Sequence, residues 1–140
     1  MSYFDSLSTS ASALTAQRLR MDVISNNLAN ANSTRTAEGG AYRRQMVVFE
    51  SRAEFKQDLA GRHGQTPLGV KVTKIVEDEA PFRLVYDPGH PDANPDGYVA
   101  YPNVNTVQEM TDMISATRSY EANVTVINAV KGMAAKALEI

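Results

Sequence analysis

The sequence predicts an α+β fold in which long N- and C-terminal helices pair as an antiparallel coiled coil beside a small β-rich middle region. Three observations support this fold class: a seven-residue apolar repeat near the N-terminus, a long helical pattern near the C-terminus, and short β-rich runs separated by Gly and Pro between them. The 140 residues divide accordingly into an N-terminal helix (1–33), an extended and β-rich middle with a Pro/Asp/Gly loop (34–103), and a C-terminal helix (104–140).

The N-terminal helix is expected from a strict seven-residue step of apolar side chains, which is typical of a coiled-coil seam. Ser2 and Asp5 have the spacing of a capping box, so the helix is expected to begin there. It should end near residues 30–33, because the Asn and Ser side chains of "NANST" compete for backbone hydrogen bonds. The seam and its flank comprise Leu7, Leu14, Met21, Ile24 and Leu28.

The C-terminal helix is expected from residue 106 to residue 138, because no proline follows Pro102 and an apolar stripe with helical spacing runs through this region. Asn105 and Gln108 are expected to form its N-terminal cap. A helix of this length would extend roughly 50 Å at about 1.5 Å per residue. The stripe drifts around the helix and comprises Val107, Met110, Ile114, Thr117, Tyr120, Val124, Ile127, Val130, Ala134 and Leu138.

The outer faces of both helices are poor in charge. Between Ser6 and Ile24 the only charged residues are Arg18, Arg20 and Asp22, and the outward positions of the C-terminal helix hold mostly Ser, Ala and Asn. A soluble coiled coil would carry Glu and Lys pairs at such positions, and a helix with one narrow seam is marginally stable alone. We therefore expect neighbouring protein surfaces to complete the packing of both helices.

The middle of the chain differs in composition from the two ends. It contains short runs of β-favouring residues in which apolar residues either alternate with polar ones or lie together. Strands are expected within residues 41–51, 69–76 and 81–86, forming a hairpin or small sheet with residues 77–81 as the connecting loop. The stretch 52–65 fits either a helical turn that ends at Gly61 or a mobile loop.

The stretch "DANPDG" has the first half of a calcium loop, with oxygen ligands at positions 1, 3 and 5 and Gly at position 6. Position 12, counted from Asp92, is Asn103 instead of a carboxylate, and Pro95 removes a backbone N–H from the turn. The favoured interpretation is a rigid loop with Asx-type hydrogen bonds that redirects the chain into the C-terminal helix, with Tyr98 and Tyr101 packing at the corner. A calcium-binding loop module is the alternative.

Composition and motifs argue against several function classes. A net charge of -2 and a pI near 5.6 give no nucleic-acid footprint. Without cysteine there is no disulfide, thiolate metal site or Cys nucleophile. His63 and His90 do not have the spacing of a helical metal pair, and no nucleophile elbow, Walker loop or dinucleotide fingerprint occurs. We expect no enzyme activity, no cofactor and no small-molecule substrate.

The first twenty residues, "MSYFDSLSTSASALTAQRLR", contain no basic n-region, continuous apolar h-region or A-x-A site, so a Sec-type signal peptide is not expected. No apolar run approaches the roughly 20 residues of a membrane-spanning helix. Export from the cytoplasm, if it occurs, would require another route.

The segment "ISNNLANANSTRT" (24–36) resembles the N-terminal signature of bacterial flagellar axial proteins, the rod and hook subunits. "EGGAYRRQMVVFE" (38–50), "YDPGHPDANPDGYVAYPNVN" (86–105) and residues 109–140 resemble the proximal-rod branch of that family. The commoner pattern Thr-x-Gly-Phe is replaced by residues 33–36 and then Tyr42, which favours the proximal rod over the longer distal-rod and hook proteins. The signature residues are Asn26, Asn27, Asn30, Asn32, Asp87, Pro88, Asp92, Asp96, Gly97, Tyr98, Pro102 and Asn103.

The resemblance implies a structural subunit of the basal-body rod, which transmits torque from the motor to the hook. Such proteins are exported unfolded through the flagellar type III apparatus without a cleaved signal peptide. They polymerise into a helical tube in the periplasmic space, whose inner wall consists of paired terminal helices. The implied partners are further copies of the chain, other rod proteins, the export apparatus and the MS-ring region. Another rod subunit of the same family is the alternative identity. The seam and stripe residues would then mediate assembly.

Overall fold

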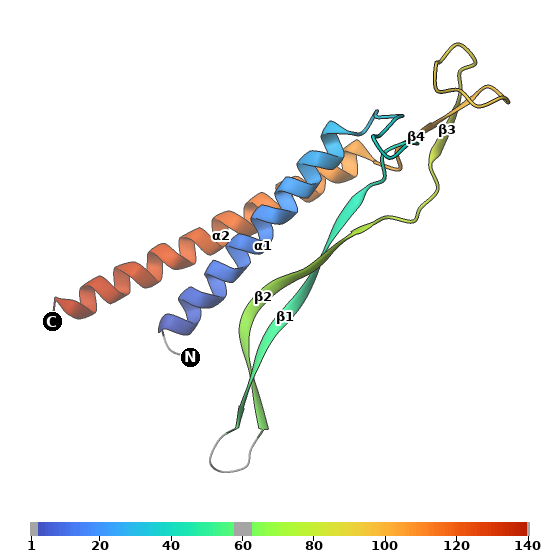
Figure 1. Cartoon of the computed structure of the whole chain (residues 1–140). Coiled ribbons are helices and arrows are strands. Elements are labelled where there is room, and N and C mark those ends of the chain that lie inside the picture. Colours follow the sequence, from blue (N-terminus) through green and yellow to red (C-terminus); the bar gives the residue numbers. More distant parts are fainter. Residues whose placement is uncertain (1–2, 58–62, 140) are drawn as a thin grey trace.

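The computed structural model describes residues 3–57 and 63–139, which form two long helices and two separate two-stranded sheets. The elements follow in the order α1 (Tyr3–Ala29), β1 (Gln45–Gln57), β2 (His63–Glu77), β3 (Arg83–Tyr86), β4 (Tyr98–Tyr101) and α2 (Thr106–Leu138). Figure 1 shows an elongated molecule in which α1 and α2 lie side by side and antiparallel, the β1–β2 hairpin runs along α1, and β3–β4 lies at the end opposite the chain termini.

Both predicted helices are confirmed, and α2 has the predicted bounds. Asn105 caps α2 as predicted: its side chain accepts hydrogen bonds from the backbone N–H groups of Val107 and Gln108. The Gln108 side chain does not complete the cap and instead donates to Asp112 Oδ2 at 3.4 Å. The expected partner of Asp5 in the first capping box, Ser2, lies outside the described residues. No helix in the described part is long and apolar enough to cross a membrane.

The antiparallel pairing is confirmed, but α1 buries a broader face than its seven-residue seam. Its buried apolar residues are Ala16, Val23 and Ile24, whereas the seam residues are only half-buried. The reason is that α1 lies between two partners, with α2 on one side and the β1–β2 hairpin on the other (Figure 1). The seven-residue seam can pack against only one of these two partners, so small residues must lie on the face of α1 toward the other partner.

The apolar stripe of α2 does not face α1 along its whole length. Val107, Met110 and Ile114 are exposed, while Val130, farther along the same stripe, is buried. Members of the stripe are mostly three residues apart, short of the 3.6 residues of one helical turn, so the stripe winds around the helix. The first third of α2 therefore points apolar side chains away from α1.

The described part of the middle region contains four strands in place of the predicted three, and the predicted pairing across residues 77–81 is wrong. β1 pairs with β2 and β3 pairs with β4, both antiparallel, so this segment crosses between two sheets. The crossing is anchored by the N–H of Asp78, which donates to Arg44 O at 2.8 Å, and by Asn103 Nδ2, which donates to the carbonyls of Asp78 and Ala80.

The region predicted as a helical turn or mobile loop also differs. Residues 54–57 continue β1 and residues 63–65 begin β2, because the two strands form one long hairpin. The rest of that prediction, residues 58–62, lies outside the described residues. β4 was not expected, because its four residues are too few to show a clear alternation.

The hairpin approaches α1 most closely at Gly69, which has a positive φ of 111°. A Cβ built at this glycine would lie 2.1 Å from Ser12 Oγ and 3.3 Å from Thr9 Cα. Ser12 Oγ donates to Thr9 O at 2.7 Å and accepts from the N–H of Val70 at 3.1 Å. Small residues thus let the β2 backbone hydrogen-bond directly to the helix surface.

We predict that Gly69→Ala destabilises the fold by at least about 2 kcal/mol, because it adds a steric clash to a left-handed backbone conformation. Gly39→Ala is the control: Gly39 has a φ of 90° with no atom near its missing Cβ, so it should cost less, about 1 kcal/mol. The measurement is urea unfolding followed by circular dichroism. Equal losses in the two variants would show that the approach to Ser12 contributes nothing.

Candidate assembly surface and its polar junction

Two groups of large apolar side chains are exposed on the helix pair. One lies near the start of α2, where Val107 is 71% and Ile114 is 55% exposed, with Met110 between them. The other lies near the chain termini and consists of Phe4, Met133 and Leu138. Exposed groups of large apolar side chains are typical of interaction sites.

The remaining residues predicted for assembly lie mainly inside the subunit. Ile24 and Val130 are buried, and the others are half-buried between the helices or beside them. Thr117 Oγ1, for example, donates to Met21 Sδ at 3.6 Å across the pair. The half-buried residues are Leu7, Leu14, Met21, Leu28, Tyr120, Val124 and Ile127. The stripe is therefore divided between intrachain packing and an outward surface.

The outer face of α1 is built from small and amide side chains, as the charge-poor pattern predicts. Its exposed positions include Ser8, Ala11, Thr15, Ser25, Asn26 and Ala29, together with the charged residues Arg18 and Asp22. Such a face can be covered by another protein at small desolvation cost, whereas burying unpaired charges would cost several kcal/mol per ion, on the order of 5.

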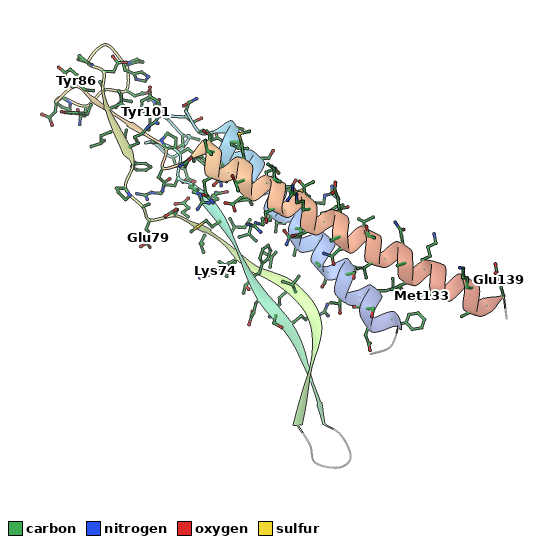
Figure 2. The ribbon with its side chains drawn as sticks, turned by 180° about the vertical axis from the view of Figure 1, so that it is seen from behind. Lys74, Glu79, Tyr86, Tyr101, Met133 and Glu139 are labelled. Atoms are coloured by element: carbon green, nitrogen blue, oxygen red, sulfur yellow. The ribbon has the colours of Figure 1, made fainter. Side chains whose placement is uncertain are left out.

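The last part of α2 extends past the start of α1. Residues 131–139 are all exposed, and Figure 2 shows Glu139 at the free end of the longer helix. Within the described residues, this end of α2 has no second helix beside it. A neighbouring subunit would have to supply its packing.

At the other end of the helix pair, Asn27 forms a buried polar contact with β1. Its side chain is 1% exposed, its Oδ1 accepts from the N–H of Gln45 at 2.9 Å, and its Nδ2 donates to Gln45 O at 2.8 Å. The amide thereby pairs with one residue of β1 as a neighbouring strand would. This contact fixes the start of the hairpin to the last turns of α1.

Glu109, in the first turn of α2, joins the same cluster. Its side chain is fully buried, with 0% exposure. Oε2 accepts from Asn27 Nδ2 at 3.0 Å, and Oε1 accepts from Arg44 Nε in a buried ion pair. Both carboxylate oxygens are therefore satisfied by groups from two other parts of the chain, α1 and the segment before β1.

Arg44 connects the cluster to further acidic groups. Its Nη1 lies 3.5 Å from Asp78 Oδ2 and its Nη2 lies 3.7 Å from Asp112 Oδ2. Asp112 also pairs with Arg20 at 3.3 Å. Burial lowers the pKa of Arg44, but the hydrogen bond and charge of Glu109, with those of Asp78, outweigh burial and raise it. We call Asn27, Tyr42, Arg44, Glu109 and Asp112 the polar junction.

Tyr42 completes the polar junction by donating its hydroxyl to Asn27 Oδ1 at 2.9 Å. Burial raises the pKa of Tyr42 above its ordinary value of 10.0, and the charges of Glu109 and Glu77 raise it further. Each of these causes favours the neutral phenol, which is the form that can donate the hydrogen bond.

The Pro/Asp/Gly loop joins β3 to β4, so it does not lead directly into α2 as expected. The predicted Asx chemistry is confirmed: Asn94 Oδ1 accepts from the N–H groups of Asp96 and Tyr98, and Asp87 Oδ1 accepts from the N–H of Gly89. Gly97 has a φ of 80° and lies against Tyr86, whose ring packs edge-to-face on Tyr98.

The loop's potential metal ligands make contacts within the chain. Asp92 accepts from Thr34 Oγ1 at 2.9 Å and lies 3.9 Å from Arg35 Nη1. His90 Nδ1 accepts from the N–H of Asp92 at 3.1 Å, and the ring lies near Tyr101. Over residues 3–57 and 63–139, no three His, Asp or Glu side chains are grouped to hold a metal ion. The side chain of His63 is outside the described set.

The signature residues separate into three places. Asn27 belongs to the polar junction, and Asn103 lies next to it, accepting from the N–H of Arg44 at 2.9 Å. Asn26 and Asn30 bond each other at the end of α1, and Asn32 is exposed in the turn that follows. The remaining members form or flank the β3–β4 loop: Asp87, Pro88, Asp92, Asp96, Gly97, Tyr98 and Pro102. The structure does not bring all of them into one site.

Arg44 and Glu109 are not among the residues that the sequence pattern singles out. The sequence does carry a signal for Glu109, because a charged residue at an inward position of a charge-poor helix needs a partner of opposite charge or a hydrogen-bond donor. The identity of that partner depends on a contact between residues 65 positions apart.

We predict that Arg44→Met destabilises the fold by about 3 kcal/mol, because the buried Glu109 carboxylate loses its cation. Arg18→Met, at an exposed position of α1, is the matched control and should change stability by less than about 0.5 kcal/mol. Urea unfolding measured by circular dichroism compares the two. A loss in Arg44→Met no larger than that of the control would contradict the ion pair's role.

We also predict a specific alkaline destabilisation. Because the folded chain holds the Tyr42 proton more tightly than the unfolded chain, this contribution is fully present below pH 10.0 and is lost as pH rises through 10.0 toward the folded pKa. Tyr42→Phe should therefore lose less stability than the wild type between about pH 9 and 11. Below about pH 9 the two proteins should have parallel profiles, which is the internal control. Profiles that stay parallel up to about pH 11 would rule the effect out.

Two family models match the ends of the chain. Residues 7–40 match the family described as flagella basal body rod protein, and residues 96–140 match the family described as flagellar basal body rod FlgEFG protein C-terminal. The matched segments contain most of α1 and all of α2. They therefore include the exposed apolar residues of α2 and the three members of the polar junction that come from the helices, Asn27, Glu109 and Asp112.

Relatives of similar length match all or most of the chain. The flagellar basal-body rod protein FlgC of Bacillus subtilis (strain 168) is 54% identical, with 100% of this chain and 99% of that protein covered. FlgC of Borreliella burgdorferi is 49% identical, with 100% and 98% covered, and FlgC of Salmonella typhimurium is 45% identical, with 92% and 90% covered. The chain belongs to the FlgC family of flagellar basal-body rod proteins.

Proposed function

We propose that this chain is a structural subunit of the proximal rod that assembles with further copies of itself and with other rod proteins into a helical tube. The rod would act as the drive shaft that carries motor torque to the hook. Family membership supports a structural protein and not an enzyme. The observation that carries the assembly proposal is the exposed apolar group Val107, Met110 and Ile114 on a helix pair with few charges.

The shape of the molecule supports assembly by helix packing. The exposed apolar residues at the start of α2 and those near the termini lie at opposite ends of one helix pair (Figures 1 and 2). A contact between different surfaces of neighbouring subunits is heterologous, and such contacts generate helical filaments when they do not close into a ring. Many small contacts along two long helices would resist bending and twisting together.

Location and route follow from the family alone. We infer that the subunit works in the basal-body rod within the periplasmic space, near the MS-ring region, after export through the flagellar type III apparatus. The support is the basal-body rod membership. Sequence boundaries of the assembly segments, residues 1–33 and 104–140, are proposed on the same basis, with residues 34–103 forming the middle.

We predict that Ile114→Asp leaves the subunit folded but abolishes incorporation into the rod and swimming. Ile114 is 55% exposed, so the substitution removes no intrachain core, but an aspartate would be costly once a neighbour covers it. Ile75→Asp is the matched control, because Ile75 is 46% exposed on the hairpin and outside the helix pair.

The measurements are soft-agar swimming and the amount of subunit in purified basal bodies, with circular dichroism to confirm folding. The control should keep both near wild-type levels. Normal rods from Ile114→Asp cells would refute the proposed surface, and an equal loss from Ile75→Asp would show that the helix pair is not the specific site.

A further inference from the structure

We propose that Asn27, Arg44 and Glu109 determine the register in which α1 and α2 pair. They are positioning residues: they select one alignment of the helices from several that the apolar residues would accept. The inference deepens the proposed function, because the alignment decides which surfaces a subunit presents to its neighbours. It starts from the repeats of the two helices.

The apolar residues of the pair leave the register ambiguous. Leu7, Leu14, Met21 and Leu28 repeat every seven residues on α1, and on α2 the buried Ala116 and Val130 are two such steps apart, with the half-buried Asn123 at the step between them. Sliding one helix past the other by seven residues, about 10 Å, returns the same kinds of side chain to every interface position of α1 and to most of those of α2. Packing alone therefore distinguishes these alignments weakly.

Asn27 supplies the fixed point on α1. Its two hydrogen bonds to the backbone of Gln45 hold the start of β1 at one height along the helix. Gly69 and Ser12 attach the other strand of the hairpin to α1, so the hairpin cannot follow a sliding α2. Arg44, directly before β1, is consequently fixed relative to α1.

Glu109 aligns α2 to that fixed point. In the observed register its carboxylate meets Asn27 and Arg44 and is fully buried. A seven-residue shift would move it about 10 Å from both groups. Even where Arg20 could then reach the carboxylate, the Asn27 amide and the Arg44 guanidinium would lose the partner they share. Breaking a buried ion pair by removing one member is strongly destabilising, which penalises every shifted register.

Register controls the outward surface. It sets where Val107, Met110 and Ile114 stand along α1, and how far the end of α2 extends beyond Tyr3. A subunit in a shifted register would present both apolar groups about 10 Å out of place, which no fixed neighbour could match. A buried polar contact that selects one alignment of helices is the best-attested use of such groups.

The test uses the absence of cysteine from the natural sequence, which allows clean placement of thiol pairs. Met21→Cys with Thr117→Cys reports the observed register, because these side chains touch at 3.6 Å. Leu14→Cys and Leu28→Cys, each with Thr117→Cys, report shifts of seven residues in the two directions. Each purified full-length chain is treated with a short bifunctional thiol reagent, and intramolecular products are quantified by mass spectrometry.

The pairs are placed in the parent chain and in a variant carrying Asn27→Leu, Arg44→Met and Glu109→Met, in which apolar residues of similar volume replace the polar contact. The control variant carries Asn26→Leu, Arg18→Met and Glu121→Met, the same three changes at exposed positions. If the first variant loses its helical circular dichroism, Arg44→Met with Glu109→Met is used in its place, since such replacements of a buried ion pair are often tolerated.

In the parent and the control, the Met21/Thr117 product should exceed each shifted product by at least about tenfold. In the variant, a shifted product should rise to within about threefold of it. A variant that keeps the tenfold preference, or a parent that shows none, overturns the proposal. Neither result depends on incorporation into rods, so failure of the register proposal can be told apart from failure of the assembly proposal.

Discussion

A fully buried carboxylate is tolerated only where cations and hydrogen-bond donors reach it from fixed positions, and Glu109 receives them from α1 and from the segment before β1. The Glu109 carboxylate has its partners only because three placements coincide. Asn27 hydrogen-bonds to the backbone of Gln45, Arg44 lies directly before β1, and α2 begins at its Asn105 cap. The three parts of the chain that meet here, around residues 27, 44–45 and 105–109, are distant in sequence. Their placement follows from one requirement, that no buried charge be left unpaired.

At one end of the helix pair, charged side chains face the interior and large apolar side chains are exposed, which is the reverse of the usual arrangement in a globular protein. At the junction end, α2 turns Glu109 and Asp112 toward the interior and exposes Met110 and Ile114. An isolated protein would gain by the opposite arrangement, since burial of each large apolar side chain contributes about 1.5 to 3 kcal/mol. The arrangement is reasonable for a subunit that covers those side chains with its neighbours, and it limits the interior contact to a specific one.

Local signals in the sequence were sufficient for the helices and insufficient for the sheets and the junction. The start of α2 follows from Asn105 and from the last proline, Pro102, both of which act within a few residues. The pairing of β3 with β4, in contrast, depends on a loop that brings Tyr86 opposite Tyr98, and the short strands carry little pattern of their own. The burial of Glu109 depends on Arg44, 65 residues away, and no local pattern encodes such a contact. Val107, Met110 and Ile114 belong to the assembly surface that the sequence predicts. Their outward position, unlike that of the buried stripe residues, results from the winding of the stripe around α2.

The two ends of the helix pair differ in kind. One end is closed by the polar junction, and at the other α2 continues alone past Tyr3 with residues 131–139 exposed (Figure 2). A fibre of such subunits, all oriented alike, would be polar in the sense used for actin or microtubules. Its two tips would expose different chemistry, bare helix at one and the β3–β4 sheet with its loop at the other. Growth, termination and the attachment of unlike neighbours could then occur at opposite tips without any change in the subunit itself.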